Sequence, residues 1–237
     1  MVFAVVLAGG KGSRMGNSDT PKQFLVLGKS PIIIHTVEKF FVNPKFEKVI
    51  VLCPGQWVSH TENMIKKSIK DDKIVVIEGG ITRNDTLYNA IKYIEQNFGL
   101  DEETIIVTHD AVRPFVTHRI IEENIAAAAK YGACDTVIPA TDTIVESKDG
   151  QTISQVPNRA ELFQGQTPQS FKAKKLKELY ESLTQNEKKD MTDACKIFSI
   201  KGEPVHLVQG EVFNMKITYP FDLRVAQTMI EGAMEND

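Results

Sequence analysis

The stretch Phe3-Ala-Val-Val-Leu7 runs directly into Ala8-Gly-Gly-Lys-Gly-Ser-Arg-Met-Gly16, and this junction decides the fold. Its first part is a continuous apolar run rich in valine, which is typical of a strand buried on both faces of a parallel sheet. In the second part, glycines interleaved with Lys11 and Arg14 can bring backbone N–H groups and positive charge close to an anion. We therefore expect a strand followed by a phosphate-binding loop; the alternative is that the glycines only form a turn.

Two common nucleotide motifs are excluded by single residues. The dinucleotide fingerprint requires glycine at position 15, where Met15 stands, and a P-loop ending at Gly28-Lys-Ser30 requires glycine at position 23, where Gln23 stands. Lys22 lies in the same connection, after Pro21, which stiffens the chain. The pattern favours a polyphosphate site to which Lys22 adds a cation, although an isolated lysine is more often a solvated surface residue.

Strand-like runs alternate with amphipathic segments along the rest of the chain. Further strands are expected at Lys48–Leu52, Ile74–Ile77, Thr104–Val107, Thr136–Pro139 and Pro204–Val208. Helices are expected around Leu87–Ile94 and Ile121–Ala128, over Lys172–Leu183 and Met191–Phe198, and after Pro220. This order predicts an α/β fold with a doubly wound, mostly parallel sheet, whose ligands bind beyond the carboxyl ends of the strands.

The pattern changes between Thr141 and about Thr167. There, Thr143–Glu146 and Thr152–Val156 flank an Asp149-Gly turn signal, which predicts a β-hairpin. Such a hairpin is too short to be stable alone and presents unpaired edges. We expect an inserted β-arm that a partner subunit covers, within a single domain that spans residues 1–237.

Composition limits the classes of partner. The 237 residues carry 28 Lys and Arg against 31 Asp and Glu, and the net charge of −3 offers no attraction to nucleic acid or to an anionic membrane. No apolar run approaches the ~20 residues of a membrane span. Cys53, Cys134 and Cys195 are too widely spaced for a Cys-x-x-Cys site and argue for reduced thiols in a cytoplasm.

The first loop, together with Pro21-Lys-Gln-Phe24, resembles the signature of the cytidylyltransferases that make CDP-linked polyols, a family with methylerythritol-phosphate and ribitol-5-phosphate members. Further segments occur in the family's order: Glu78-Gly-Gly-Ile-Thr-Arg83, His109-Asp-Ala-Val-Arg-Pro114, Gln166-Thr-Pro-Gln169, Met191-Thr-Asp193 and Asn214-Met-Lys-Ile-Thr218. The likeness covers essentially the whole chain and implies a Rossmann-like nucleotidyltransferase with an arm for dimerisation.

The resemblance implies a role for each segment. Its catalytic residues match Arg14, Lys22, Arg159 and Lys216. Its nucleotide-binding residues match Leu7, Ala8, Gly9, Gly10, Lys11, Gly12, Gly79, Gly80, Arg83, Thr86 and Ala111. Its acceptor-binding residues match Arg113, Arg159, Thr167, Thr192 and Lys216. Taken alone, Thr86 reads as a helix-surface residue, Arg159 as a solvated arginine, and Arg113 equally well as the partner of a carboxylate.

Asp110 ends a predicted strand, where a carboxylate can hold Mg²⁺ against nucleotide phosphates. A lone aspartate at such a place is more often a helix cap or a turn residue. The resemblance assigns the metal to Asp110.

The implied reaction is attack of a sugar-phosphate oxygen on the α-phosphorus of CTP, with pyrophosphate leaving. Val112, Phe163-Gln-Gly165 and Asp190-Met-Thr-Asp-Ala-Cys195 look more like ribitol-5-phosphate members, which implies CDP-ribitol synthesis for a teichoic-acid-type wall polymer. The alternative acceptor is 2-C-methyl-D-erythritol 4-phosphate of isoprenoid synthesis. The resemblance also implies a homodimer in which Arg159 completes the acceptor site of the neighbouring subunit.

Two other functional classes are less consistent with these residues. A nicotinamide-dependent oxidoreductase on a similar fold would need the third glycine of the fingerprint, and it does not account for the basic first loop. A non-catalytic nucleotide-binding module does not explain cations gathered from four separate loops.

Overall fold

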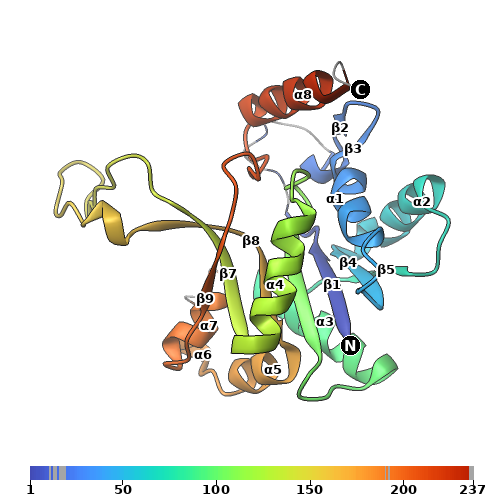
Figure 1. Ribbon diagram of the computed structural model, residues 1–237, viewed down its shortest axis with the longest axis horizontal. Helices are drawn as coiled ribbons and strands as arrows, with labels where there is room; N and C mark the ends of the chain where they lie inside the picture. The colour runs from blue at the N-terminus through green and yellow to red at the C-terminus, as the bar shows by residue number, and fades with distance from the viewer. Residues whose placement is uncertain (11, 13–14, 16–19, 190, 192, 235–237) are drawn as a thin grey trace.

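One mixed sheet forms the centre of the computed structural model, which describes residues 1–10, 12, 15, 20–189, 191 and 193–234 (Figure 1). Its strands lie in the order β5-β4-β1-β6-β8-β7-β9. They span Ile74–Glu78 (β5), Lys48–Cys53 (β4), Val2–Leu7 (β1), Ile105–Asp110 (β6), Phe163–Lys172 (β8), Ala133–Pro139 (β7) and His206–Gln209 (β9). Neighbours are parallel except at β8, which is antiparallel to both β6 and β7. The predicted α/β fold with a mostly parallel sheet is confirmed.

Helices cover both faces of this sheet. One face is packed by α1 (Ile32–Phe41), α2 (Val58–Ser68) and α4 (His118–Tyr131), the other by α3 (Arg83–Phe98), α5 (Ala173–Glu181) and α7 (Cys195–Ile200). A further apolar cluster joins α8 (Pro220–Met234) to the small ladder of β2 (Val26–Leu27) and β3 (Ser30–Pro31). Short helices span Lys22–Phe24 (η2), Gly55–Trp57 (η3), Arg159–Glu161 (η4) and Gln185–Lys189 (α6). Burial on both faces explains why the strands read as continuous apolar runs.

Strand β8 corrects the sequence analysis, which places residues 163–167 in the arm, starts a helix at Lys172 and assigns no element to residues 168–171. Pro168 and the polar side chains around it argue against a central strand. These side chains are nevertheless buried, because they have partners: Ser170 Oγ, for example, donates to Asn124 Oδ1 at 3.1 Å. A buried strand with satisfied polar groups has neither an apolar nor an alternating pattern.

The arm also differs from its prediction, because Thr143–Glu146 and Thr152–Val156 form no strands. A single antiparallel bridge joins Glu146 to Gln155. The turn between them is closed by Asp149 Oδ1, which accepts hydrogen bonds from two following N–H groups at 2.8 Å. The segment between β7 and β8 projects from the body as an extended arm, and its last predicted residues, 163–167, belong to β8 (Figure 1).

Two smaller predictions are wrong near the carboxyl end. The helix expected over Met191–Phe198 is α7, which begins only at Cys195. The strand-like run Asn214–Thr218 is an irregular crossing segment, held where Ile217 N donates to Val112 O at 2.9 Å. Within the part of the chain that the structure describes, no helix is both long and apolar enough to span a membrane.

Candidate active site

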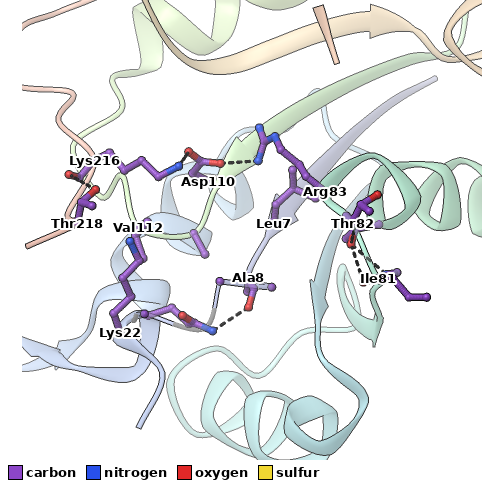
Figure 2. A pocket seen from close by; sticks show the side chains of 17 residues that line it. Leu7, Ala8, Lys22, Ile81, Thr82, Arg83, Asp110, Val112, Lys216 and Thr218 are labelled. Carbon is purple, nitrogen blue, oxygen red and sulfur yellow. Dashed lines mark hydrogen bonds and ion pairs between the residues drawn. The ribbon is translucent and has the colours of Figure 1, made fainter. Parts of the chain in front are cut away.

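A cavity of about 330 Å³ opens beyond the carboxyl ends of β1 and β6 (Figure 2). It is lined by Leu7, Ala8, Gly9, Gly10, Gly12, Lys22, Gln23, Gly80, Ile81, Thr82, Arg83, Thr86, Asp110, Ala111, Val112, Lys216 and Thr218. Most of the residues predicted to bind the nucleotide therefore share one cavity. The predicted residues Lys11, Arg14 and Thr192 lie outside the described part of the chain.

The first loop is tied to the sheet and to η2. Ala8 N donates to Leu52 O at 2.7 Å, and the buried Gln23 amide donates from Nε2 to Ala8 O at 2.7 Å. Gly12 has a φ of +71°, in the left-handed region that favours glycine. A Cβ at this position would also lie 3.3 Å from Lys22 N, so glycine lets the loop pass close to η2.

Lys22 is a cation held inside the cavity. Its side chain is only 7% exposed, and its Nζ donates to Ile217 O at 2.9 Å. The lysine thus reaches from η2 across to the crossing segment 214–218, as Figure 2 shows beside Val112 and Thr218. Its buried position removes the reading of Lys22 as a solvated surface residue.

The loop after β5 is shaped by the amino terminus of α3. Thr82 and Asp85 form a capping box, in which each side chain accepts a hydrogen bond from the other residue's N–H. Thr86 Oγ1 accepts from Gly80 N at 2.9 Å and donates to Thr82 O at 2.8 Å. A Cβ on Gly80 would overlap Asp85 and lie 2.8 Å from Thr86 N, so only glycine fits. Thr86 holds the loop in shape; its direct contact with a base stays a prediction.

Asp110, at the end of β6, is surrounded by cations. Arg83 Nη1 lies 2.6 Å from Oδ1, while Lys216 Nζ and Arg113 Nε lie 2.9 Å and 3.5 Å from Oδ2. Burial alone would raise the pKa of Asp110, but the attraction of Arg83, Lys216 and Arg113 holds that pKa far below its usual range. The carboxylate is therefore ionised at any physiological pH.

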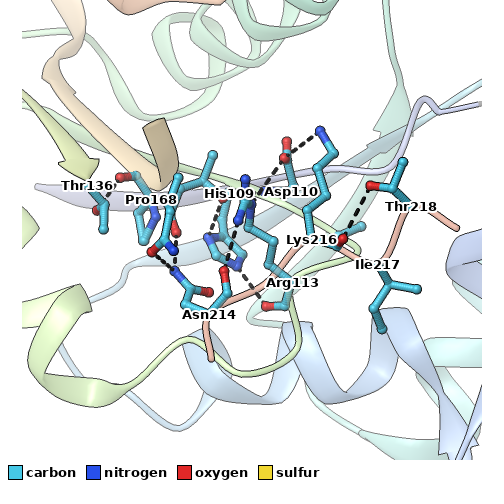
Figure 3. A network of polar contacts seen from close by, with 12 residues as sticks. His109, Asp110, Arg113, Thr136, Pro168, Asn214, Lys216, Ile217 and Thr218 are labelled. Carbon is cyan, nitrogen blue, oxygen red and sulfur yellow. Dashed lines mark hydrogen bonds and ion pairs between the residues drawn. The ribbon is translucent and has the colours of Figure 1, made fainter. Parts of the chain in front are cut away.

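A hydrogen-bond relay that the sequence analysis missed holds Asp110 from behind (Figure 3). His109 Nε2 lies 3.0 Å from Arg113 O, which can only accept, so Nε2 carries the proton and Nδ1 accepts from the Thr167 hydroxyl at 3.0 Å. Thr167 Oγ1 in turn accepts from Asp110 N at 3.2 Å. Burial lowers the pKa of His109 to about 4, which keeps it neutral. Thr167, which is 4% exposed, lies behind Asp110 and does not line the cavity.

The crossing segment is latched to β8 by Asn214, which is fully buried. The Nδ2 of Asn214 donates to Thr167 O at 2.8 Å and to Gln166 Oε1 at 3.1 Å. The main-chain carbonyl of Asn214 accepts from Arg113 Nη1 at 2.8 Å. This latch places Lys216 over Asp110 and explains why a lysine stands between two apolar residues. The family-like segment contained Asn214, but its residue type gave no separate signal of this role.

Residues 2–232 match the family model of IspD, 2-C-methyl-D-erythritol 4-phosphate cytidylyltransferase. The chain belongs to the IspD family of cytidylyltransferases. It resembles the solved IspD of Francisella tularensis at 26% identity and a TM-score of 0.80, over 96% of this chain and 98% of that chain. The 2-C-methyl-D-erythritol 4-phosphate cytidylyltransferase of Thermus thermophilus is 25% identical, with a TM-score of 0.73 over the same shares. The 4-diphosphocytidyl-2C-methyl-D-erythritol synthase of Anaerococcus prevotii, at 24% identity, shares the fold with a TM-score of 0.79, over 97% of this chain and 96% of that chain.

A CTP-dependent IspD-family cytidylyltransferase brings together two polyanions, CTP and a sugar or polyol phosphate. The site supplies positive charge to match them. Arg83, Arg113 and Lys216 come from three different segments of the chain and surround the Asp110 carboxylate, and Lys22 from a fourth segment lines the same cavity. This local excess of positive charge contrasts with the net charge of −3 for the whole chain. It lies at the sheet edge where ligands of such folds bind.

Asp110 also fits a site for a divalent cation. Among the described residues, no cluster of three or more His, Cys, Asp or Glu side chains is placed to hold a metal. Asp110 is the one carboxylate among the described cavity-lining residues, and each of its oxygens keeps a lone pair after binding Arg83 and Lys216. Mg²⁺ commonly takes only one or two protein carboxylates together with substrate phosphates. The donor set therefore fits a metal shared with the nucleotide.

Arg159 is not brought to this cavity within one subunit. It begins η4 on the projecting arm, and its Nη1 donates to Thr141 O at 2.9 Å. The residue is exposed, and it does not line the cavity. Its role at an acceptor site therefore stays a prediction that depends on a second subunit.

Proposed function

We propose that this cytidylyltransferase transfers CMP from CTP to ribitol 5-phosphate, giving CDP-ribitol and pyrophosphate for synthesis of a teichoic-acid-type wall polymer. The observation that carries the reaction class is the convergence of Lys22, Arg83 and Lys216 on one cavity beside Asp110. Support for ribitol comes from Val112, Phe163-Gln-Gly165 and the segment 190–195, which look more like ribitol-5-phosphate members of the family.

The reaction needs charge neutralisation more than proton transfer. An oxygen of the acceptor phosphate forms a bond to the α-phosphorus of CTP, the bond from that phosphorus to the bridging oxygen breaks, and pyrophosphate leaves with the electron pair. Lys22 stabilises charge on the nucleotide phosphates, and Lys216 holds the attacking phosphate in line. Arg14 from the first loop joins Lys22 in this role. The attacking phosphate is already ionised at pH 7, so no general base is required.

Mg²⁺ bound at Asp110 would neutralise phosphate charge and withdraw electrons from the α-phosphorus. Arg83 and the His109 relay keep Asp110 ionised and correctly aimed for this role. We expect chelation of divalent cations to abolish turnover and added Mg²⁺ to restore it. Full turnover in excess chelator would remove the metal role from Asp110.

A second acceptor, 2-C-methyl-D-erythritol 4-phosphate, is favoured by the names of the matching family and of the solved structures. The two acceptors are phosphorylated polyols that differ in chain length, a methyl branch and a hydroxyl group. Pyrophosphate release from CTP, measured separately with each acceptor, distinguishes them. Turnover only with the methylerythritol compound would overturn the ribitol assignment, and turnover with neither would contradict both.

A further inference from the structure

A second carboxylate lies on the same face of the sheet as Asp110, two strands away. Asp135 of β7 is in register with Gln169 of β8, which is in register with Thr108 of β6. Ile106, Ala133 and Phe171 point into the core beneath α3, α5 and α7. Because side chains alternate along a strand, Asp110, Asp135 and Gln169 face that same side. Two strand spacings separate β6 from β7, which is about 10 Å.

One oxygen of the Asp135 carboxylate lies above an exposed glycine. Gln169 Nε2 donates to Oδ1 of Asp135 at 3.1 Å, and the Cys195 thiol also donates a hydrogen bond to this carboxylate. Its Oδ2 is directed over Gly165, because a Cβ built on that glycine would lie 3.5 Å from Oδ2. Gly165 is exposed, whereas Asp135 is half-buried. The carboxylate therefore presents an acceptor oxygen above bare backbone at the open end of the sheet.

One nearly buried group beside Asp135 lacks a hydrogen-bond partner among the described residues. Gln169 is 3% exposed, and its Oε1 accepts no hydrogen bond from the part of the chain that the structure describes. Arg113 Nε lies 3.5 Å from Asp110 Oδ2, and the Arg113 guanidinium also attracts Asp135 electrostatically. An unpaired buried polar atom is uncommon and costly, and this one lies in the side chain that binds Asp135. It is consistent with a ligand that donates hydroxyl groups.

We propose, resting on the polyol-phosphate function above, that Asp135 accepts hydrogen bonds from the hydroxyl groups of an acyclic polyol phosphate that are remote from its phosphate. The phosphate end lies at Lys216 and Arg113, and the carbon chain extends over Gly165 toward Asp135. A site built to bind a hydroxyl strongly rejects an analogue that lacks it, because a buried polar group is then left unpaired. Asp135 thereby selects an acyclic chain that is long enough to bring a hydroxyl group to its oxygen, over a chain that is one carbon shorter.

The test compares ribitol 5-phosphate with 1-deoxyribitol 5-phosphate in wild-type protein and in Asp135→Asn. Wild-type kcat/KM should fall by about tenfold or more for the deoxy compound. Asp135→Asn should lower kcat/KM for ribitol 5-phosphate by about tenfold, through KM, and bring the two acceptors within about threefold of each other. The KM for CTP should stay unchanged. Asp72→Asn, the same change at an exposed position, is the matched control.

A second variant tests the role of Asp135 even if the Asp135→Asn protein folds poorly. In Gly165→Ala the new methyl group makes only an ordinary contact with Asp135 Oδ2, so the fold is retained while the space above that oxygen is filled. We expect the same selective rise in KM for ribitol 5-phosphate. Equal rates for both acceptors in the wild-type protein, or a preference that survives both variants, would overturn the role of Asp135 alone. If the wild-type protein does not use ribitol 5-phosphate at all, the proposed function fails with it.

Discussion

Lys216 is a single residue that both pairs with Asp110 and faces the cavity. Its Nζ lies 2.9 Å from Asp110 Oδ2, yet the side chain is 41% exposed, so the ammonium group faces both the carboxylate and the cavity. We expect Lys216→Met to lower kcat/KM by a factor of about 10²–10³, or about 3–4 kcal/mol, as for loss of other preorganised charge-stabilising groups. Steady-state kinetics measure this loss, with the exposed Lys67→Met as control.

The fold should survive this change, because Arg83 and Arg113 still neutralise Asp110. A thermal midpoint close to that of the wild-type protein would show this. An intact fold with undiminished kcat/KM would exclude Lys216 from phosphate binding.

Asp135 also carries a stability cost that depends on pH. Burial raises its pKa to about 6, while the hydrogen bonds from Gln169 and Cys195 and the charge of Arg113 oppose this rise and Asp193 adds to it. A carboxyl whose pKa is raised on folding does not lower the free energy of unfolding well below about pH 4, where it is protonated in both the folded and the unfolded chain. Between about pH 4 and pH 6 the unfolded chain ionises first, so stability falls, and the full cost remains above pH 6.

We therefore expect Asp135→Asn to stabilise the protein at pH 8, by about 3 kcal/mol, and to have almost no effect at about pH 3. Asparagine keeps an oxygen that can accept from Gln169 Nε2. Denaturant unfolding at the two pH values measures the difference. A gain of the same size at both pH values would mean that ionisation of Asp135 is not its source.

At the scale of elements, the loop between β5 and α3 depends on one glycine. Gly80→Ala would place a Cβ against Asp85 and 2.8 Å from Thr86 N, in the first turn of α3. We expect the loop to shift, and KM for CTP to rise by about tenfold or more together with loss of any preference for CTP over UTP. Initial rates with the two nucleotides measure this.

The matched control is Gly232→Ala in α8, where an added Cβ meets nothing within 4 Å. That helix position should favour alanine by up to about 1 kcal/mol. If Gly80→Ala keeps both the KM for CTP and the base preference, the loop does not contact the base.

The elements that the sequence predicts best are those with an apolar or amphipathic period. β1 and most of β4 are continuous apolar runs, β6 begins with one, and α3 is bounded by the capping residue Thr82 and by Gly99 at a φ of +81°. β8 is not predictable in this way, because its buried polar side chains are satisfied only by partners from distant segments. The strands predicted in the arm do not form although their sequence has apolar residues. Within one subunit these residues have no core to pack against, and Ile153 and Val156 remain more than half exposed.

The candidate site also contains some residues that the sequence identifies and others that it does not. Loop residues such as Gly80 and Lys22 are identifiable from composition, spacing and resemblance. The relay through His109 and the latch at Asn214 are not, since a buried histidine 58 residues from Thr167 has no local pattern. Asp135 gives no sequence signal either, because its significance arises from strand register with Gln169.

At the scale of the whole molecule, the arm is the part that one subunit leaves without a packed core. It carries Ile144, Val145, Ile153 and Val156 at exposed positions, together with Arg159. A projecting segment of this length with exposed apolar side chains is suited to a symmetric contact, in which each arm reaches the other subunit. We expect a homodimer in which Arg159 completes the acceptor site of the neighbouring subunit.

Mixing two inactive variants, Lys216→Met and Arg159→Ala, tests this arrangement. If Arg159 acts on the neighbouring subunit, one site in each heterodimer combines Lys216 of the Arg159→Ala chain with Arg159 of the Lys216→Met chain. Random pairing makes half of the dimers mixed, so about a quarter of wild-type activity should return. If Arg159 serves its own subunit, every site still lacks one cation, and activity should not exceed that of the separate variants. Subunit exchange is verified by native mass spectrometry of the mixture, so that a lack of recovery in exchanged dimers counts directly against a role for Arg159 across the interface.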